Sequence, residues 1–260
     1  MSKVSPGAKI HLIAIGGAVM HNLALDLQAA GYQVSGSDDR IDEPARGRLA
    51  TAGLLPEPMG WDASRITPDL DTVVLGMHAK ADNPELQRAL ELGIRVCSFP
   101  ELVGEMTAHQ QRLVVAGSHG KTTVTSMVMH ALRFHGINFD YLVGSAMPGY
   151  ERMVQLGTKA AAVVLEGDEY LSSALDPRPK MSHYNPHATV ITGIAWDHIN
   201  VFPTRESYEN VFADYIRSLE PGAVLIYFEE DPILARLVQE NGRGLELKPY
   251  KAAPYVVEDG

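Results

Sequence analysis

The stretch Val115-Ala116-Gly117-Ser118-His119-Gly120-Lys121-Thr122 joins an expected strand, residues 113–116, to an expected helix, residues 121–134. Glycines let backbone N–H groups turn inward around phosphate oxygens, and a helix N-terminus adds positive potential. Lys121 can neutralise outer phosphates, and the Thr122 hydroxyl can ligate Mg2+. The spacing departs from G-x-x-x-x-G-K-[ST] because Val115 occupies the first glycine position. The stretch predicts a phosphate loop for a nucleoside triphosphate, with a plain strand-to-helix turn as the alternative.

Around this loop, short apolar runs alternate with helical stretches, a pattern that predicts parallel strands joined by crossover helices. The expected strands are residues 10–15, 33–37, 72–75, 95–98, 161–165, 189–192 and 224–228. The other expected helices are residues 19–30, 84–92, 205–219 and 232–239. Residues 245–260 alternate without a helical period and read as an element cut short. We therefore predict a Rossmann-like parallel-sheet domain, residues 1–110, followed by a P-loop α/β domain, residues 111–260, which is incomplete.

Composition excludes several classes of protein. The 260 residues are 45% hydrophobic, which suits two modest globular domains rather than a disordered chain. Lys and Arg number 22 against 32 Asp and Glu, a net charge of −10 that disfavours a nucleic-acid-binding surface. The single cysteine, Cys97, cannot form an intrachain disulfide, and no apolar run approaches the ~20 residues of a membrane span. Residues 1–10 carry no signal-peptide pattern, so the expected compartment is the cytoplasm.

Acidic residues follow the strand at 161–165. Glu166 lies at its carboxyl end, where ligands of parallel sheets collect, and is the first metal candidate. For Asp168 and Glu169, a solvated acidic turn and a direct metal ligand remain equal alternatives. His198 follows the strand at 189–192 and is the second metal candidate, although a lone histidine is more often a core or capping residue.

A glycine turn, Ile15-Gly16-Gly17-Ala18-Val19-Met20, follows the first strand and opens a helix. Its adjacent glycines do not match G-x-G-x-x-G, so NAD is disfavoured and a sugar nucleotide is the better ligand. Ser37-Asp38-Asp39 and Gly76-Met77-His78-Ala79 follow the next two strands. Three strand ends thus converge on one expected ligand, although a helix cap equally explains the serine and aspartate. The candidate contacts are Gly16, Gly17, Ala18, Met20, Ser37, Asp38, His78 and Ala79.

Taken in order with Glu166-Gly167-Asp168-Glu169-Tyr170 and Trp196-Asp197-His198, the glycine turn and phosphate loop resemble the ATP-dependent Mur ligases of peptidoglycan metabolism. Residues 176–186, DPRPKMSHYNP, resemble the recycling branch, which joins UDP-N-acetylmuramate to a murein peptide, and not the branch that adds L-alanine. The resemblance extends over nearly all of the chain.

The resemblance implies a UDP-sugar domain, a central ATPase domain and a C-terminal domain. It implies an ATP and Mg2+ site in which Lys121, Glu166 and His198 act catalytically. Thr122 and Glu166 would hold one metal ion and His198 a second. The implied ATP contacts are Gly117, Ser118, His119, Gly120, Lys121, Thr122 and Thr123. The implied reaction transfers a phosphoryl group from ATP to the muramoyl carboxylate, and the peptide amine then attacks the acyl phosphate. Charge neutralisation and positioning carry most of such a transfer.

Two departures from the family pattern bear on activity. Residues 205–219 contain no lysine, which excludes metal bridging by a carbamoylated lysine on that helix. The sequence also stops before the family's adenine-contacting His-Asn motif and its third domain, so we expect UDP-sugar binding with little or no ligation by these 260 residues alone. The alternatives are an L-alanine-adding ligase, a non-catalytic UDP-sugar-binding module, and a P-loop kinase or ATPase acting on another acid.

Overall fold

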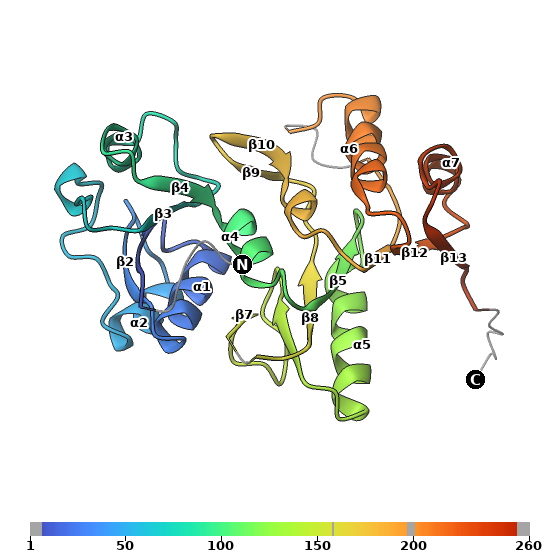
Figure 1. Cartoon of the computed structure of the whole chain (residues 1–260), viewed down its shortest axis with the longest axis horizontal. Helices are drawn as coiled ribbons and strands as arrows, with labels where there is room; N and C mark the ends of the chain where they lie inside the picture. The colour runs from blue at the N-terminus through green and yellow to red at the C-terminus, as the bar shows by residue number, and fades with distance from the viewer. Residues whose placement is uncertain (1–6, 158, 197–200, 254–260) are drawn as a thin grey trace, which may run out of the picture.

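A computed structural model describes residues 7–157, 159–196 and 201–253, and within them the chain forms two parallel-sheet regions (Figure 1). The first sheet has four parallel strands in the order β2-β1-β3-β4. They are β1 (Lys9–Ile13), β2 (Gln33–Ser37), β3 (Thr72–Leu75) and β4 (Arg95–Ser98). The helices of this region are α1 (Ala18–Ala29), α2 (Ala45–Thr51), α3 (Pro84–Glu91) and α4 (Phe99–Met106), with the short 3-10 helix η1 (Ala63–Arg65).

The second sheet has the order β13-β12-β11-β5-β8-β6-β7, and only β7 runs antiparallel to its neighbour. Its strands are β5 (Gln111–Ala116), β6 (Phe139–Leu142), β7 (Val154–Gln155), β8 (Ala162–Glu166), β11 (Ala188–Ile191), β12 (Val224–Phe228) and β13 (Glu246–Tyr250). Its helices are α5 (Lys121–Phe134), α6 (Arg205–Ser218) and α7 (Pro232–Asn241). Figure 1 shows α5 on one side of this sheet and α6 and α7 on the other. The connection from β8 to β11 carries the hairpin β9 (Leu171–Ser173) and β10 (Asp176–Pro179) and the 3-10 helix η2 (Lys180–His183).

Local sequence explains where several helices begin. The Asn83 side chain accepts hydrogen bonds from the N–H groups of Glu85 and Leu86, and Pro84 occupies the first turn of α3. Thr204 caps α6 in a reciprocal capping box with Ser207. These caps fix the residues at which α3 and α6 begin.

The predicted α/β class with parallel sheets is confirmed. Four strands (33–37, 72–75, 95–98 and 224–228) and the helix at 121–134 have the predicted bounds, and the other predicted elements differ by one or two residues at an end. The sequence analysis missed α2, α4, β6, β7 and the β9–β10 hairpin. Each is short, and β6 also contains a charged residue, Asp140, that interrupts its apolar run. The stretch that read as an unfinished element contains β13.

The two regions are joined through α1. The Asn22 side-chain oxygen accepts a hydrogen bond from the Met153 N–H at 3.1 Å, and the Asp26 carboxylate accepts one from the Leu156 N–H at 3.0 Å. All four residues are buried. The helix of the glycine turn therefore packs against the β7 edge of the second sheet, which brings the carboxyl ends of the two sheets toward one another.

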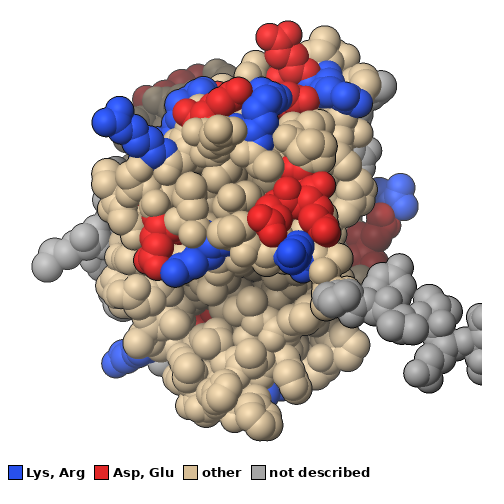
Figure 2. Space-filling model, turned by 90° about the vertical axis from the view of Figure 1, so that its right-hand side faces the viewer, with Lys and Arg blue, Asp and Glu red and all other residues tan. Residues whose placement is uncertain are grey.

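Charged side chains of both signs are mixed on the surface around α6 and α7 (Figure 2). On the face that carries α6 and α7, Lys and Arg side chains lie beside Asp and Glu and form no continuous basic area (Figure 2). Among the helices in the described ranges, none is both long and apolar enough to cross a membrane.

Candidate nucleotide and sugar-nucleotide site

The predicted phosphate loop lies between β5 and α5, where its two outer glycines are required. Gly117 has φ +124° and Gly120 has φ +78°, backbone conformations that other residues rarely adopt. A Cβ atom on Gly117 would lie 2.2 Å from the Thr192 hydroxyl oxygen. Thr192 follows β11, and its hydroxyl donates to the His119 carbonyl at 2.6 Å. The loop is therefore held in a tight turn at the start of α5.

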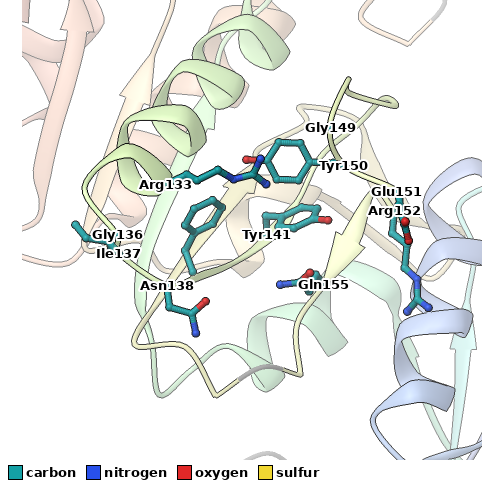
Figure 3. Close-up of a pocket in the computed structure, with 11 residues that line it drawn as sticks. Arg133, Gly136, Ile137, Asn138, Tyr141, Gly149, Tyr150, Glu151, Arg152 and Gln155 are labelled. Carbon is teal, nitrogen blue, oxygen red and sulfur yellow. The ribbon is translucent and has the colours of Figure 1, made fainter.

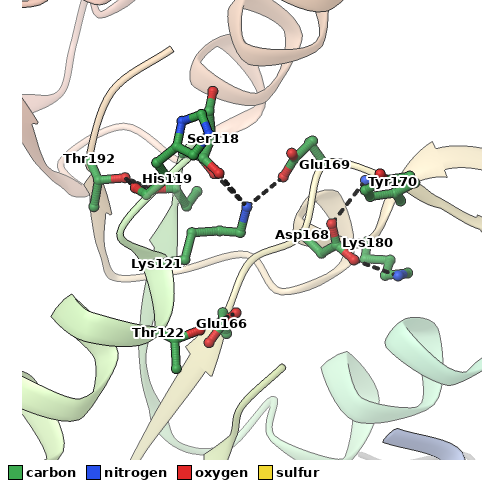
Figure 4. A network of polar contacts seen from close by, with 12 residues as sticks. Ser118, His119, Lys121, Thr122, Glu166, Asp168, Glu169, Tyr170, Lys180 and Thr192 are labelled. Carbon is green, nitrogen blue, oxygen red and sulfur yellow. Dashed lines mark hydrogen bonds and ion pairs between the residues drawn. The ribbon is translucent and has the colours of Figure 1, made fainter. Parts of the chain in front are cut away.

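Lys121 is the first residue of α5, and its ammonium group points back over the loop. It donates to the carbonyl oxygens of Gly117 at 2.7 Å and Ser118 at 3.3 Å, and it pairs with the Glu169 carboxylate at 3.0 Å (Figure 4). The Glu169 side chain is fully buried. The solvated-turn reading of Glu169 is therefore wrong, and its carboxylate is a counter-ion of the phosphate-loop lysine.

Tyr208, on α6, extends this network. Its hydroxyl donates to the second Glu169 oxygen at 3.2 Å and lies 2.8 Å from the Ser118 hydroxyl, which in turn accepts from the Ala195 N–H. Buried polar groups in such a chain fix one another's orientation. The neighbouring acid, Asp168, is directed elsewhere and pairs with Lys180 at 2.5 Å (Figure 4).

Thr122 and Glu166 provide the oxygen donors expected for a cation. The Thr122 hydroxyl donates to one carboxylate oxygen of Glu166 at 3.1 Å. The second oxygen of Glu166 is buried and has no hydrogen-bond partner. Burial raises the pKa of Glu166, while a backbone hydrogen bond from Gly144, the Thr122 hydroxyl and the charge of Lys121 oppose that rise. An unsatisfied carboxylate oxygen beside a hydroxyl suits Mg2+, which prefers hard oxygen ligands.

The remaining metal prediction concerns His198, which lies outside the described residues. Within the ranges that are described, no group of three or more His, Cys, Asp and Glu side chains is close enough to hold a metal ion. Thr122 and Glu166 would thus supply only part of a coordination shell, as is usual for Mg2+, which keeps several waters or substrate phosphates.

A cavity of about 580 Å3 lies between the glycine turn and the second sheet. Five predicted residues line it, namely Gly16, Gly17, Ala18, Asp38 and His78. Asp38 accepts a hydrogen bond from the Gly16 N–H at 2.8 Å, and burial raises the pKa of its carboxyl group. From the second region the loop residues Gly144, Ser145 and Ala146 close the opposite wall. The cavity is therefore shared by both regions.

Three predicted contacts do not line this cavity. Met20 lies on the inner side of α1 and packs in the core, and Ala79 is buried beside β3. Ser37 is fully buried, and its hydroxyl donates to the Glu85 carboxylate beside His11. Sequence reasoning in turn missed five titratable residues of the lining, His21, Arg40, Asp42, Glu43 and Arg48. Arg40 lies in the loop after β2 and Arg48 in the short helix α2. The sequence there has no apolar periodicity that predicts an element or a site.

Two further hollows lie along α5. One of about 480 Å3 is lined by Thr122 and Thr123 at the start of the helix, by Arg133 near its end and by Ala146. The other, of about 700 Å3, lies at the carboxyl end of α5, where the Arg133 guanidinium stands 4.3 Å over the Tyr150 ring (Figure 3). The phosphate loop is at the opposite end of this helix, roughly 20 Å away. The larger hollow is thus separate from the phosphate loop.

Fold and site together define an α/β protein whose second sheet carries a phosphate loop and whose first sheet opens onto a shared cavity. Comparison with known families identifies it further. The family described as Mur ligase middle domain matches residues 115–250, and the family described as Mur ligase family, catalytic domain matches residues 9–111. The chain belongs to the Mur ligase family.

Relatives by sequence include UDP-N-acetylmuramate–L-alanine ligases. That of Rhodococcus jostii is 35% identical over 243 residues, which are 91% of this chain and 46% of the relative. That of Mycobacterium tuberculosis is 32% identical over 251 residues, 95% of this chain and 49% of the relative. The chain therefore spans about half the length of these relatives.

Solved structures of two kinds of ligase share the fold. The UDP-N-acetylmuramate:L-alanyl-gamma-D-glutamyl-meso-diaminopimelate ligase of Neisseria meningitides has a TM-score of 0.83 at 27% identity, over 94% of this chain and 77% of that one. The UDP-N-acetylmuramate-alanine ligase of Thermotoga maritima has a TM-score of 0.69 at 26% identity, over 88% and 51%. The expectation of a Mur ligase is confirmed, and the matches include both alanine-adding and peptide-joining ligases.

Proposed function

We propose that this chain is the UDP-N-acetylmuramate- and ATP-binding part of an ATP-dependent Mur ligase, with residues 1–110 and 111–260 as its two domains. One observation carries the proposal: Gly144 lines the shared cavity and donates a backbone hydrogen bond to Glu166, which the Thr122 hydroxyl also reaches. A sugar-nucleotide carboxylate in the cavity would therefore lie next to the phosphate loop. Both ligands are cytoplasmic metabolites, which makes the cytoplasm the proposed compartment.

In this proposal the cationic residue of the loop binds phosphate and the oxygen donors bind metal. Lys121 would neutralise the outer phosphates of ATP, and the backbone N–H groups at the start of α5 would face phosphate oxygens. Thr122 and Glu166 would hold one Mg2+ ion, and His198 of the predicted motif would hold a second metal ion; when bound, such ions offset phosphate charge. Glu169 and Tyr208 would keep Lys121 directed over the loop. No protein nucleophile is needed, because the muramoyl carboxylate attacks the phosphorus directly and ADP leaves.

The amine acceptor has two candidates. We propose the murein peptide, supported by the sequence of residues 176–186 and by the higher TM-score of the Neisseria ligase, 0.83 against 0.69 for the Thermotoga alanine ligase. L-Alanine is the second candidate, and the sequence relatives favour it, since those reported above are alanine ligases. In either case the amine displaces inorganic phosphate from the muramoyl phosphate, which forms the amide.

The test uses the complete protein with UDP-N-acetylmuramate, ATP and Mg2+, and measures ADP release with L-alanine or with L-alanyl-gamma-D-glutamyl-meso-diaminopimelate. Faster turnover with the tripeptide supports the peptide proposal, whereas preference for L-alanine assigns the protein to the second candidate. Release with neither acceptor would contradict ligase function. Calorimetry on the 260-residue chain adds a direct check, because UDP-N-acetylmuramate binding without any response to ATP and Mg2+ would indicate a non-catalytic sugar-nucleotide module.

A further inference from the structure

Residues 192–195, which follow β11, form a strap across the phosphate loop. The Thr192 hydroxyl donates to the His119 carbonyl at 2.6 Å. The Gly193 carbonyl accepts from the Ser118 N–H at 3.0 Å, and the Ala195 N–H donates to the Ser118 hydroxyl at 2.8 Å. Ser118 is therefore hydrogen-bonded to the strap through both its backbone N–H and its side-chain hydroxyl.

Asp231 holds this strap from the other side. One of its carboxylate oxygens accepts a short hydrogen bond, 2.6 Å, from the Ile194 N–H. Its other oxygen caps α7 by accepting from the N–H groups of Ile233 at 2.9 Å and Leu234 at 3.0 Å. One oxygen of the Asp231 carboxylate thus caps α7, and the other accepts a hydrogen bond from the strap.

The geometry points to Asp231 as a positioning residue for the phosphate loop. The Ile194 N–H and the Gly193 carbonyl belong to one planar peptide group, so Asp231 fixes one end of that group while Ser118 binds the other. Gly193 has φ +145°, a backbone conformation that other residues rarely adopt. Because glycine has no side chain, packing of residue 193 cannot hold this peptide plane in place. Without the carboxylate, this peptide group is free to rotate and to release Ser118. The inference rests on the proposed function only in assigning phosphate binding to the loop.

Two substitutions separate the strap role from the capping role. Asp231→Asn keeps an oxygen for the α7 cap, at which Asn and Asp are about equally effective, but presents an NH2 group to the Ile194 N–H. Asp231→Ser also caps the helix, and its shorter side chain does not reach Ile194. Asp62→Asn is the matched control, because Asp62 caps η1 through Ser64 in the first region and makes none of the strap hydrogen bonds described above.

The experiment measures hydrogen exchange of the 260-residue chain without nucleotide, followed by calorimetric titration with ATP and Mg2+ and with UDP-N-acetylmuramate. In both Asp231 variants we expect the Ser118 and Ala195 amides to exchange at least about tenfold faster, with β8 amides unchanged, and ATP to bind about tenfold more weakly. Affinity for UDP-N-acetylmuramate and all values for Asp62→Asn should match the parent chain.

Unchanged exchange at Ser118 and Ala195 in both Asp231 variants would overturn the inference. Uniformly faster exchange throughout the chain would also overturn it, because that is the result expected of a capping residue alone. If the parent chain binds no ATP, the proposed function fails, and the exchange data still decide whether Asp231 positions the loop.

Discussion

Asp26 is expected to make the stability of this protein fall as the pH rises. Its side chain lies in the contact between α1 and the β7 edge, is 6% exposed, and accepts the Leu156 N–H. Burial raises its pKa from 3.8 to about 6, opposed by that hydrogen bond and by the charge of Arg152. The folded state thus favours the protonated carboxyl group. Its stabilising contribution is complete below pH 3.8 and is lost as the pH rises through about 6.

The size of this effect follows from the two pKa values. The interval from 3.8 to about 6 corresponds to roughly 3 kcal/mol of unfolding free energy by pH 7.5. Asp26→Asn keeps an oxygen for the Leu156 N–H and places an NH2 group where the protonated oxygen lies, without any charge. We therefore expect the variant to be more stable than the parent by roughly 1 to 3 kcal/mol at pH 7.5 and equally stable near pH 4.

The assay is urea or thermal unfolding of both chains between pH 4 and 8, from which the difference in unfolding free energy is plotted against pH. For a chain of this size, the expected gain at pH 7.5 is up to roughly 10 °C in the unfolding midpoint. Asp62→Asn serves as the control, because the Ser64 hydrogen bonds lower the pKa of this exposed carboxyl group and its loss should bring no gain at neutral pH. A difference between Asp26→Asn and the parent that is flat with pH would refute the reasoning.

Three other predictions concern the two ligand sites. Lys121→Ala should abolish ATP turnover in a complete ligase and leave UDP-sugar affinity nearly intact by calorimetry, and loss of both together would contradict two separate sites. Glu166→Gln should remove the Mg2+ dependence of ATP affinity. Burial raises the pKa of Glu166, so on acidification the parent should lose this dependence at a higher pH than it would with a carboxylate of ordinary pKa. Gly16→Ala would place a Cβ atom 2.8 Å from Ile41 and 2.9 Å from the Asp38 carboxylate, so UDP-sugar affinity should fall about tenfold while ATP affinity is unchanged; equal loss of both would point to general unfolding.

The strand, turn and helix around Lys121 could be predicted because they follow one another within about twenty residues and each depends on local chemistry. Glu166 could be placed as well, since parallel strands bring their carboxyl ends to one edge, and it does meet Thr122 there. Such rules name the edge of the sheet at which a residue lies. They do not give the direction of its side chain.

That missing direction explains the errors. Asp168 and Glu169 are adjacent and chemically alike, yet Asp168 pairs with Lys180, whereas Glu169 pairs with Lys121 and accepts from the Tyr208 hydroxyl. Ser37 lies at a strand end as expected, but its hydroxyl turns inward to a buried carboxylate 48 residues away in sequence. The contact between Asp231 and Ile194 spans 37 residues and has no local pattern. Such pairings depend on tertiary structure and leave no signal in spacing.

The site is also more dependent on the junction of the two regions than its separate motifs suggest. Gly144 stands between the shared cavity and Glu166, and a Cβ atom on it would lie 2.6 Å from a carboxylate oxygen of Glu166. Glycine at this position keeps the wall between the cavity and Glu166 thin, which in the proposed function would let the carboxylate of the sugar nucleotide lie near the ATP phosphates. The Gly144 wall is in turn part of the segment whose later residues, Met153 and Leu156, are tied to α1. Loosening α1 from this segment would therefore widen the proposed gap between the two ligands and also disturb the cavity wall that α1 supplies through Ala18 and His21.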